Sequence, residues 1–369
     1  LLREAHEEAW ATLEYCAGAI YTGSGVLAGT SLADVIFTKV IGRLMKSIKN
    51  DFEKDGIQHG FLKLPHSHDD SAWGTINITI TVAKNEVVTT IILNGAIHGD
   101  EYEGPVALFD LANEINPKEL SGRVIIIPGM NYPAFQAGKR TSPIDGGNMN
   151  RVFPGDPEGN FTQKIADYFT RTLLPLADYV VDFHSGGKTM EFLPFCAAHI
   201  LEDKKQQSLC IAAMKAFNAP HSLMLLEIDA ANMYDTAAEN MGKVFISTEL
   251  GGGGSTTAYT VGIAKKGIQN ILRHSGITKG AMEVDETLNL DMPDDSCYVF
   301  SETSGLVEHC VDLGEEVKAG QVVAKIHNLE RTGAPSKEYF AGIDGIYTGR
   351  HFPGLIAAGD FLGVISVPI

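Results

Sequence analysis

Between residues 49 and 290 the chain alternates apolar, β-branched runs with segments of helical periodicity, and this alternation most constrains its fold. The predicted strands cover residues 75–83, 87–97, 122–128, 179–184, 222–226 and 243–250. The predicted helices cover residues 105–115, 162–174, 204–216 and 259–274. This pattern predicts an α/β fold with a mostly parallel or mixed sheet, covered by helices on both faces. Functional side chains are then expected at the carboxyl ends of the strands.

Two of these strand ends carry residue types that bind metals. His98 and Glu101 directly follow the strand predicted at 87–97, and the strand at 179–184 ends in His184. A catalytic zinc takes three protein ligands of this kind and keeps a fourth position open. Because the carboxyl ends of neighbouring parallel strands meet at one edge, the sequence predicts that His98, Glu101 and His184 bind one zinc ion per chain.

Three further charged residues are candidates for a role in chemistry. Glu249 lies at the end of the strand predicted at 243–250 and precedes four glycines. Burying an unpaired carboxylate is unfavourable, but beside a metal it can take a proton from water and pass it to a leaving amine. Arg140 and Arg151 lie on loops. They are either solvated, or they polarise a scissile carbonyl and hold a substrate carboxylate.

Charge and composition exclude several classes of protein. The 369-residue chain has a formal net charge of −17 and a hydrophobic content of 44%. This composition is that of a globular protein, and the negative charge makes nucleic acids and anionic membranes poor partners. No apolar run approaches the roughly 20 residues of a membrane span. The five cysteines are widely spaced and include no Cys-x-x-Cys, so we expect a reducing cytoplasm.

The chain divides into three segments by pattern. Residues 1–48 do not join the αβ alternation, so we expect an N-terminal extension of unknown role. Residues 49–292 form the predicted zinc-dependent catalytic α/β domain, and residues 293–369 form a C-terminal β domain of short strands with glycine turns.

The C-terminal segment repeats itself. The surroundings of Gly305 and Gly320 recur loosely around Gly345 and Gly359, which predicts a small barrel or sandwich with pseudo-twofold symmetry. This pattern resembles the biotinyl/lipoyl barrel. A carrier domain needs an exposed hairpin lysine, and the hairpin region here offers only Lys337. We therefore expect a structural role rather than a carrier function.

In their order along the chain, these motifs resemble the succinylglutamate desuccinylase/aspartoacylase branch of the zinc carboxypeptidase clan, over about residues 50–369. The shared pattern is His-x-x-Glu, an Arg, an Asn-Arg pair, a strand-end His and a late Glu. The resemblance implies zinc ligands His98, Glu101 and His184, an oxyanion-stabilising Arg140, a substrate-carboxylate site at Asn150 and Arg151, and Glu249 as general base and then acid. Where the family often has an Asp that supports a zinc-binding histidine, this chain has Asn148, whose amide oxygen can still accept a hydrogen bond.

The resemblance implies a zinc-dependent amidohydrolase that removes the acyl group from a small N-acyl amino acid. Segments 55–61, 71–74 and 98–105 narrow it to the Nα-acetyl-L-2,4-diaminobutyrate deacetylases of ectoine breakdown. A succinylglutamate desuccinylase, an aspartoacylase, a zinc carboxypeptidase and a non-enzymatic metal-binding protein with an interaction β domain are the alternatives. The side-chain ammonium of diaminobutyrate needs an acidic partner, for which Glu191, Glu227 and Asp229 are candidates. The oligomeric state stays open, and a homo-oligomer is compatible with the sequence.

Overall fold

The computed structural model describes residues 46–47, 52–86, 89–226 and 229–369. The N-terminal extension expected at residues 1–48 and the candidate ammonium ligand Glu227 therefore lie outside the described residues, apart from a two-residue strand, β1 (Lys46–Ser47). No helix in these described ranges is long and apolar enough to span a membrane.

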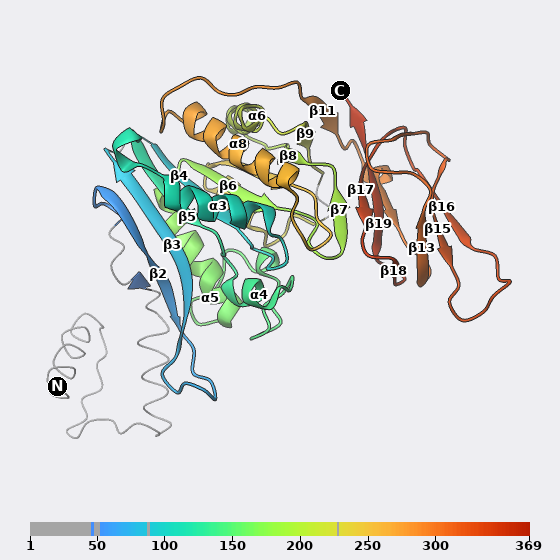
Figure 1. The fold of residues 1–369 in the computed structure, drawn as a ribbon, viewed down its shortest axis with the longest axis horizontal. Helices are drawn as coiled ribbons and strands as arrows, with labels where there is room; N and C mark the ends of the chain where they lie inside the picture. Colours follow the sequence, from blue (N-terminus) through green and yellow to red (C-terminus); the bar gives the residue numbers. More distant parts are fainter. Residues whose placement is uncertain (1–45, 48–51, 87–88, 227–228) are drawn as a thin grey trace. The chain divides into compact units, whose positions relative to one another are not determined.

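A mixed sheet forms the centre of the α/β region (Figure 1). Its strands are β2 (Gly56–Pro65), β3 (Thr75–Asn85), β4 (Thr89–Gly95), β5 (Gly122–Ile127), β6 (Tyr179–His184), β8 (Phe195–Ala198), β9 (His221–Met224), β10 (Val244–Glu249) and β11 (Leu288–Asp291). Strands β5, β4, β6 and β10 are parallel neighbours in that order. Strands β2 and β3 join one side antiparallel, and β8 joins the other side antiparallel to β10. The predicted mixed sheet is confirmed, with its parallel part confined to the centre and to β8, β9 and β11.

Helices cover both faces of this sheet, because neighbouring strand residues point to opposite sides. Ile91 and Leu93 of β4 pack in one core with α3, α6 and α8, whereas Ile92 packs in the other core with α5 and α7. The helices are α3 (Glu103–Glu114), α4 (Tyr132–Ala137), α5 (Phe161–Tyr168), α6 (Lys204–Phe217), α7 (Tyr234–Asn240) and α8 (Ala258–His274). Figure 1 shows α3 and α8 side by side on one face.

Two predicted elements end earlier than expected. The helix predicted at 162–174 is α-helical only to Tyr168 and continues as a π-helical turn and a 3-10 turn, η4 (Leu174–Leu176). Pro175 has no backbone N–H to donate, so the α-helical pattern cannot continue through it. The strand predicted at 87–97 ends at Gly95, because Ala96 takes a left-handed conformation with φ 51° and turns the chain out of the sheet.

The C-terminal strands form two facing sheets around their own core. They are β12 (Tyr298–Phe300), β13 (Gly305–His309), β14 (Glu316–Val317), β15 (Val322–His327), β16 (Lys337–Phe340), β17 (Gly345–His351), β18 (Leu355–Ile356) and β19 (Phe361–Pro368). The repeats interlock, since β14 of the first unit pairs with β17 of the second and β18 of the second pairs with β13 of the first. Lys337 lies in β16 and pairs with Glu302.

Backbone hydrogen bonds join the strands of the α/β region to the C-terminal strands. β11 pairs with β19, and a short strand that the sequence reading missed, β7 (Met190–Phe192), pairs with β17. β7 follows β6 after a five-residue turn, 185–189, so the C-terminal strands reach the part of the chain directly beyond His184.

Candidate metal centre and active site

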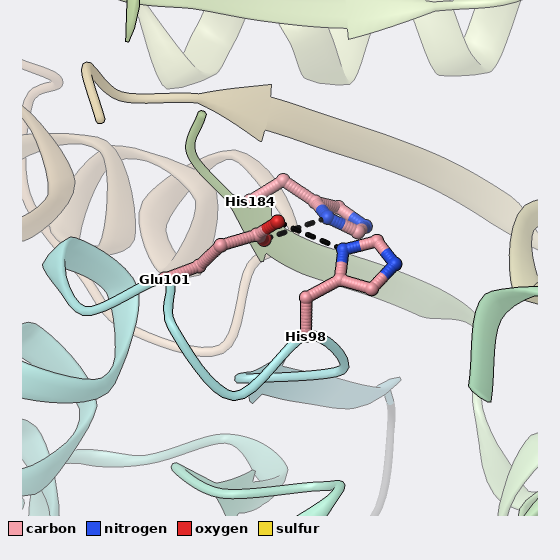
Figure 2. A group of neighbouring side chains, drawn as sticks. All are labelled: His98, Glu101 and His184. Carbon is pink, nitrogen blue, oxygen red and sulfur yellow. Dashed lines mark hydrogen bonds and ion pairs between the residues drawn. The ribbon is translucent and has the colours of Figure 1, made fainter. Parts of the chain in front are cut away.

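The loop between β4 and α3 presents two of the predicted ligands. His98 and Glu101 lie on it and are only 3% and 2% exposed. A Cβ atom at Gly99 would lie 2.0 Å from the carbonyl carbon of Ala134, so glycine lets the loop pack directly against α4. This packing turns both side chains toward His184 at the end of β6, as Figure 2 shows.

The structure brings the three predicted ligands together. Nδ1 of His98 lies 2.8 Å from Oε1 of Glu101, and Nδ1 of His184 lies 3.0 Å from Oε2 of the same carboxylate. The backbone N–H of Ser185 also donates to Oε2, at 3.3 Å. One ligand atom from each of the three residues lies within 4.8 Å of the others.

Asp182 orients His184, and the sequence reading did not single it out. Its Oδ2 lies 2.9 Å from Nε2 of His184, and its Oδ1 accepts a 2.6 Å hydrogen bond from Nδ2 of Asn94. The signal was available, because residues two apart on a strand point to the same face. Asn148 does not take this role: its amide oxygen accepts the backbone N–H of Asn150 and caps the short turn η2 (Met149–Arg151). The described residues show no hydrogen bond from Asn148 to His98 or His184, so the support expected from Asn148 is not seen.

Without a metal, the local electrostatics keep His98 neutral and Glu101 ionised, whereas they favour the protonated form of His184. Burial and the charge of Arg140 lower the pKa of His98 to about 4, so its ring is neutral at pH 7, the form that binds metals. Burial alone would raise the pKa of Glu101, but His98 and His184 hold that pKa well below its usual range. Burial alone would lower the pKa of His184, but Asp182 and Glu101 raise it well above its usual value.

The donor set fits a zinc ion. Two imidazoles and one carboxylate form a common set of protein ligands for catalytic zinc. The Nδ1 atoms of His98 and His184 both face the Glu101 carboxylate, so a metal bound among them would replace those hydrogen bonds. A metal-binding histidine usually bonds a carboxylate through its second nitrogen, as Asp182 does here with His184. The second nitrogen of His98, Nε2, is buried and has no hydrogen-bond partner among the described residues.

Glu249 lies beside this group on the neighbouring strand. β10 runs parallel to β6, and their register pairs Glu249 with His184. Its Oε2 is buried without a hydrogen-bond partner in the described part of the chain. Burial and the negative charge of Glu101 raise the pKa of Glu249 to about 8. A carboxyl group with such a pKa can exchange a proton near neutral pH.

A second buried carboxyl group lies close enough to Glu249 to influence its pKa. Glu103, the first residue of α3, is 1% exposed, and its pKa is raised to about 7, mainly by burial. The sequence reading did not select Glu103, because a Glu in the first turn of a helix is usually explained by the helix dipole.

The arginines have different surroundings. Nη1 of Arg140 lies 3.5 Å from Oε1 of Glu101, and the Arg140 side chain is 38% exposed, so it borders the ligand group from the solvent side. Arg151 is exposed, and its Nη1 donates to the backbone carbonyl of Asn150 at 2.6 Å. Asn150 is buried, and its Oδ1 accepts the backbone N–H of Tyr234, which leaves its Nδ2 as the group it offers to a ligand.

The acidic candidates for a substrate ammonium have partners elsewhere. Oε2 of Glu191 accepts from Nε and Nη2 of Arg350, at 3.0 and 2.7 Å. Asp229 is exposed, and its Oδ1 accepts the backbone N–H of Ala231. None of these contacts links Glu191 or Asp229 to the three ligands.

Comparison with known proteins supplies a family. Residues 87–275 match the succinylglutamate desuccinylase/aspartoacylase catalytic domain. Over 318 residues, the chain is 50% identical to N-alpha-acetyl-L-2,4-diaminobutyric acid deacetylase of Halomonas elongata, covering 86% of this chain and 93% of that protein.

Solved structures extend this similarity to the fold. The product-bound structure of the ectoine utilization protein EutE (DoeB) from Ruegeria pomeroyi is 60% identical with a TM-score of 0.85, covering 86% of this chain and 97% of that one. A succinylglutamate desuccinylase from Silicibacter sp. TM1040 is 58% identical with a TM-score of 0.84, covering 87% and 98%. The names of the Halomonas and Silicibacter proteins imply different acyl groups, acetyl and succinyl.

Proposed function

Because the chain belongs to the succinylglutamate desuccinylase/aspartoacylase family of hydrolases, which act on N-acyl amino acids, we propose that it deacetylates Nα-acetyl-L-2,4-diaminobutyrate in ectoine breakdown. The products are acetate and 2,4-diaminobutyrate. The 50% identity to a deacetylase of this name and the 60% identity to an ectoine utilization protein support this substrate. The observation that carries the hydrolytic chemistry is the convergence of His98, Glu101 and His184 beside Glu249.

We propose that His98, Glu101 and His184 hold a zinc ion. When bound, zinc acts as a Lewis acid that polarises the amide carbonyl and makes water more acidic. The Asp182 carboxylate keeps the His184 ring turned so that Nδ1 faces Glu101. Burial keeps His98 neutral and therefore able to bind the metal.

Glu249 carries the proton in this proposal. As a carboxylate it accepts a proton from the attacking water, and the resulting carboxylic acid donates that proton to the nitrogen of the departing amine. Its pKa of about 8 reflects burial and the Glu101 charge, and both favour the protonated form that the second step requires. A positioned acid–base group of this kind typically contributes about 10²–10⁴-fold to the rate.

The remaining residues bind and orient. The Arg140 guanidinium, at the solvent side of Glu101, can donate to the carbonyl oxygen as negative charge develops there. Nδ2 of Asn150 and the guanidinium of Arg151 are the donors proposed for the substrate α-carboxylate. Because Asn150 is locked to the backbone of Tyr234, its amide is held in one orientation for binding.

A dicarboxylate acylase is the second candidate, because one similar structure is named a succinylglutamate desuccinylase. Such a substrate would need a further cation where diaminobutyrate needs an acid. We also propose a cytoplasmic location, on the basis of the widely spaced cysteines.

Side-by-side values of kcat/KM test the substrate. Purified enzyme loaded with zinc is assayed by mass spectrometry on Nα-acetyl-diaminobutyrate, N-acetyl-aspartate and N-succinyl-glutamate. We expect the diaminobutyrate derivative to be the best of the three. The Glu249→Gln variant, prepared in the same way, controls for a contaminating hydrolase. Preference for either dicarboxylate by about tenfold, a difference of 1.4 kcal/mol, ends the diaminobutyrate proposal and leaves the acylase chemistry intact.

A further inference from the structure

Two loops extend beyond the sheet from the proposed catalytic residues. Residues 185–189 follow His184, and residues 251–254 follow Glu249. The loops bond to each other through the backbone: Gly186 N–H donates to Gly251 O at 3.0 Å, and Gly254 N–H donates to Gly187 O at 2.6 Å. The ladder of β6 and β10 sets the backbone register of Glu249 and His184, and these further bonds tie together the two loops that follow them.

Residues 251–254 form a glycine loop whose own sequence does little to restrict its conformation. All four residues have positive φ, from 68° to 139°, a region that glycine enters freely and other residues avoid. A Cβ atom at Gly252 would lie 2.2 Å from the carbonyl oxygen of Met190, so this loop packs directly on the first residue of β7. Its shape is imposed by β7 rather than by its own sequence.

The C-terminal strand β17 holds β7 from the other side. Their antiparallel register places Arg350 opposite Glu191 and Gly349 opposite Phe192. Beyond β17, the N–H of Phe352 donates to the carbonyl of Thr189 at 2.8 Å. The Phe352 ring lies 3.5 Å from the point that a Cβ of Gly253 would occupy. Phe352, just beyond β17, thus contacts both the loop 185–189 and the glycine loop 251–254.

Arg350 of β17 forms the ion pair between β17 and β7. Its Nε and Nη2 both reach Oε2 of Glu191, at 3.0 and 2.7 Å, and its Nη1 lies 3.4 Å from Asp312. The side chains of Arg350 and Glu191 are 24% and 34% exposed. Partial burial limits screening by solvent, so this pair is held more firmly than the more exposed Lys337–Glu302 pair of the four-stranded sheet β16-β15-β13-β18, the outer sheet of the C-terminal region.

We propose that Arg350 is a positioning residue for the hydrolytic reaction, and this inference rests on the proposed function. Arg350 holds Glu191, the pairing of β7 with β17 holds the turn after His184, and β7 in turn shapes the glycine loop that follows Glu249. Glu191 accordingly acts as an anchor for β7 and not as the ligand of a substrate ammonium. Through β7, the C-terminal strands thereby hold the two loops that follow His184 and Glu249, and so adjust how these two side chains are placed.

Arg350→Met and Glu191→Gln test this role. Both remove the charge pair and nearly preserve side-chain size. Because a misplacement of about 1 Å can lower a rate by about 10²-fold, we expect kcat to fall by about 10- to 100-fold while KM changes by about twofold or less. Zinc content should stay at the wild-type level, since neither residue contacts His98, Glu101 or His184. Lys325→Met is the matched control: it breaks the Lys325–Glu338 pair of the outer sheet and should leave kcat unchanged.

A charge exchange separates positioning from a general loss of stability. Glu191→Arg combined with Arg350→Glu restores the pair across the same register position, and we expect it to recover most of the lost kcat. Arg350→Lys should give an intermediate kcat, because Lys keeps the charge but offers a single donor atom. Melting temperatures and circular dichroism establish that each variant is folded at the assay temperature.

Three results would overturn the inference: a wild-type kcat in folded Arg350→Met, an equal loss in Lys325→Met, or a rise in KM confined to the diaminobutyrate substrate in Glu191→Gln. The last would make Glu191 an ammonium ligand. The assays use whichever N-acyl amino acid the wild type hydrolyses best, because a positioning defect affects all substrates alike. Failure of the diaminobutyrate assignment therefore leaves this test intact.

Discussion

Ionisable side chains are treated in opposite ways in two regions of this molecule. At the carboxyl edge of the α/β sheet, His98, Glu101 and Asp182 are at most 3% exposed and bond to one another or to His184. In the outer sheet of the C-terminal region, Lys325 and Lys337 meet Glu338 and Glu302 at the surface. Buried charges are unfavourable unless they are paired or used, whereas surface pairs contribute little. This concentration of buried charge supports the proposal that the chemistry takes place at the sheet edge and that the outer sheet has a supporting role.

The largest effect is expected from removing a ligand. His184→Ala should lose both zinc and activity, because the remaining His98 and Glu101 provide too few ligands for tight binding. Metal analysis of the dialysed protein and an activity assay measure the result. If a folded His98→Ala, His184→Ala double variant kept near-stoichiometric zinc, the zinc would be bound by other residues and the assignment would be wrong.

Glu249→Gln should separate chemistry from metal binding. Gln is nearly isosteric but cannot accept and return a proton, so kcat should fall by about 10²–10⁴-fold. Zinc content and affinity for the product should persist, which calorimetry can establish on the same preparation. Turnover close to wild type would exclude Glu249 as the proton carrier.

Asp182→Asn tests the support of a ligand rather than the ligand itself. Loss of the carboxylate that bonds Nε2 of His184 should weaken zinc affinity by about 10- to 100-fold, measured by competition with a chelator. Asn148→Ala is the control, since Asn148 caps a turn and should leave the affinity unchanged. If Asn148→Ala weakened zinc binding as much as Asp182→Asn, the assignment of Asp182 would be wrong.

Arg151→Ala should act on substrate binding. A bidentate charged pair contributes about 1.5–3 kcal/mol, so KM should rise by about 10- to 100-fold. An N-acyl amine without the α-carboxylate should be a poor substrate for the wild type. The wild type and Arg151→Ala should have similar kcat/KM values on that compound. An unchanged KM in Arg151→Ala would mean that the exposed guanidinium is solvated and that another donor holds the carboxylate.

The smallest effect is expected in the outer sheet. Lys337→Met breaks an exposed ion pair with Glu302, and exposed pairs of this kind often contribute nothing measurable. Zinc content, kcat/KM and melting temperature should all match the wild type. A loss of activity in the folded variant would contradict the proposal that the chemistry depends on the carboxyl edge of the α/β sheet and not on surface charges of the outer sheet.

Sequence pattern located most of the long elements, although it missed the ten-residue strand β2. The strands at 179–184 and 243–250 and the helices at 204–216 and 259–274 occur as β6, β10, α6 and α8 with small shifts at their ends. Their apolar periodicity is long enough to be decisive. The short strands β7 and β8 were missed, because three or four residues carry too little periodicity to be distinguished from a loop.

Some residues of the candidate site could be predicted from the sequence and others could not. His98, Glu101 and His184 could be selected from sequence because each follows an apolar strand, and parallel strands deliver their ends to one edge. Glu191 could not be interpreted, because its partner Arg350 is distant in sequence and meets it only through the pairing of β7 with β17. Asn148 was assigned to the wrong partner for a related reason: a local backbone N–H competes well with a distant imidazole.

The sequence by itself determined the α/β class, the residue types of the ligand group and the repeat in the C-terminal strands, because these depend on local periodicity and spacing. Only the tertiary structure decided that Asp182 supports His184, that Glu249 lies beside His184 on the neighbouring strand, and that Arg350 pairs with Glu191 of β7. Such contacts depend on strand register and on chain segments far apart in sequence. Register is set by the packing of the whole core, and no short stretch of residues carries it.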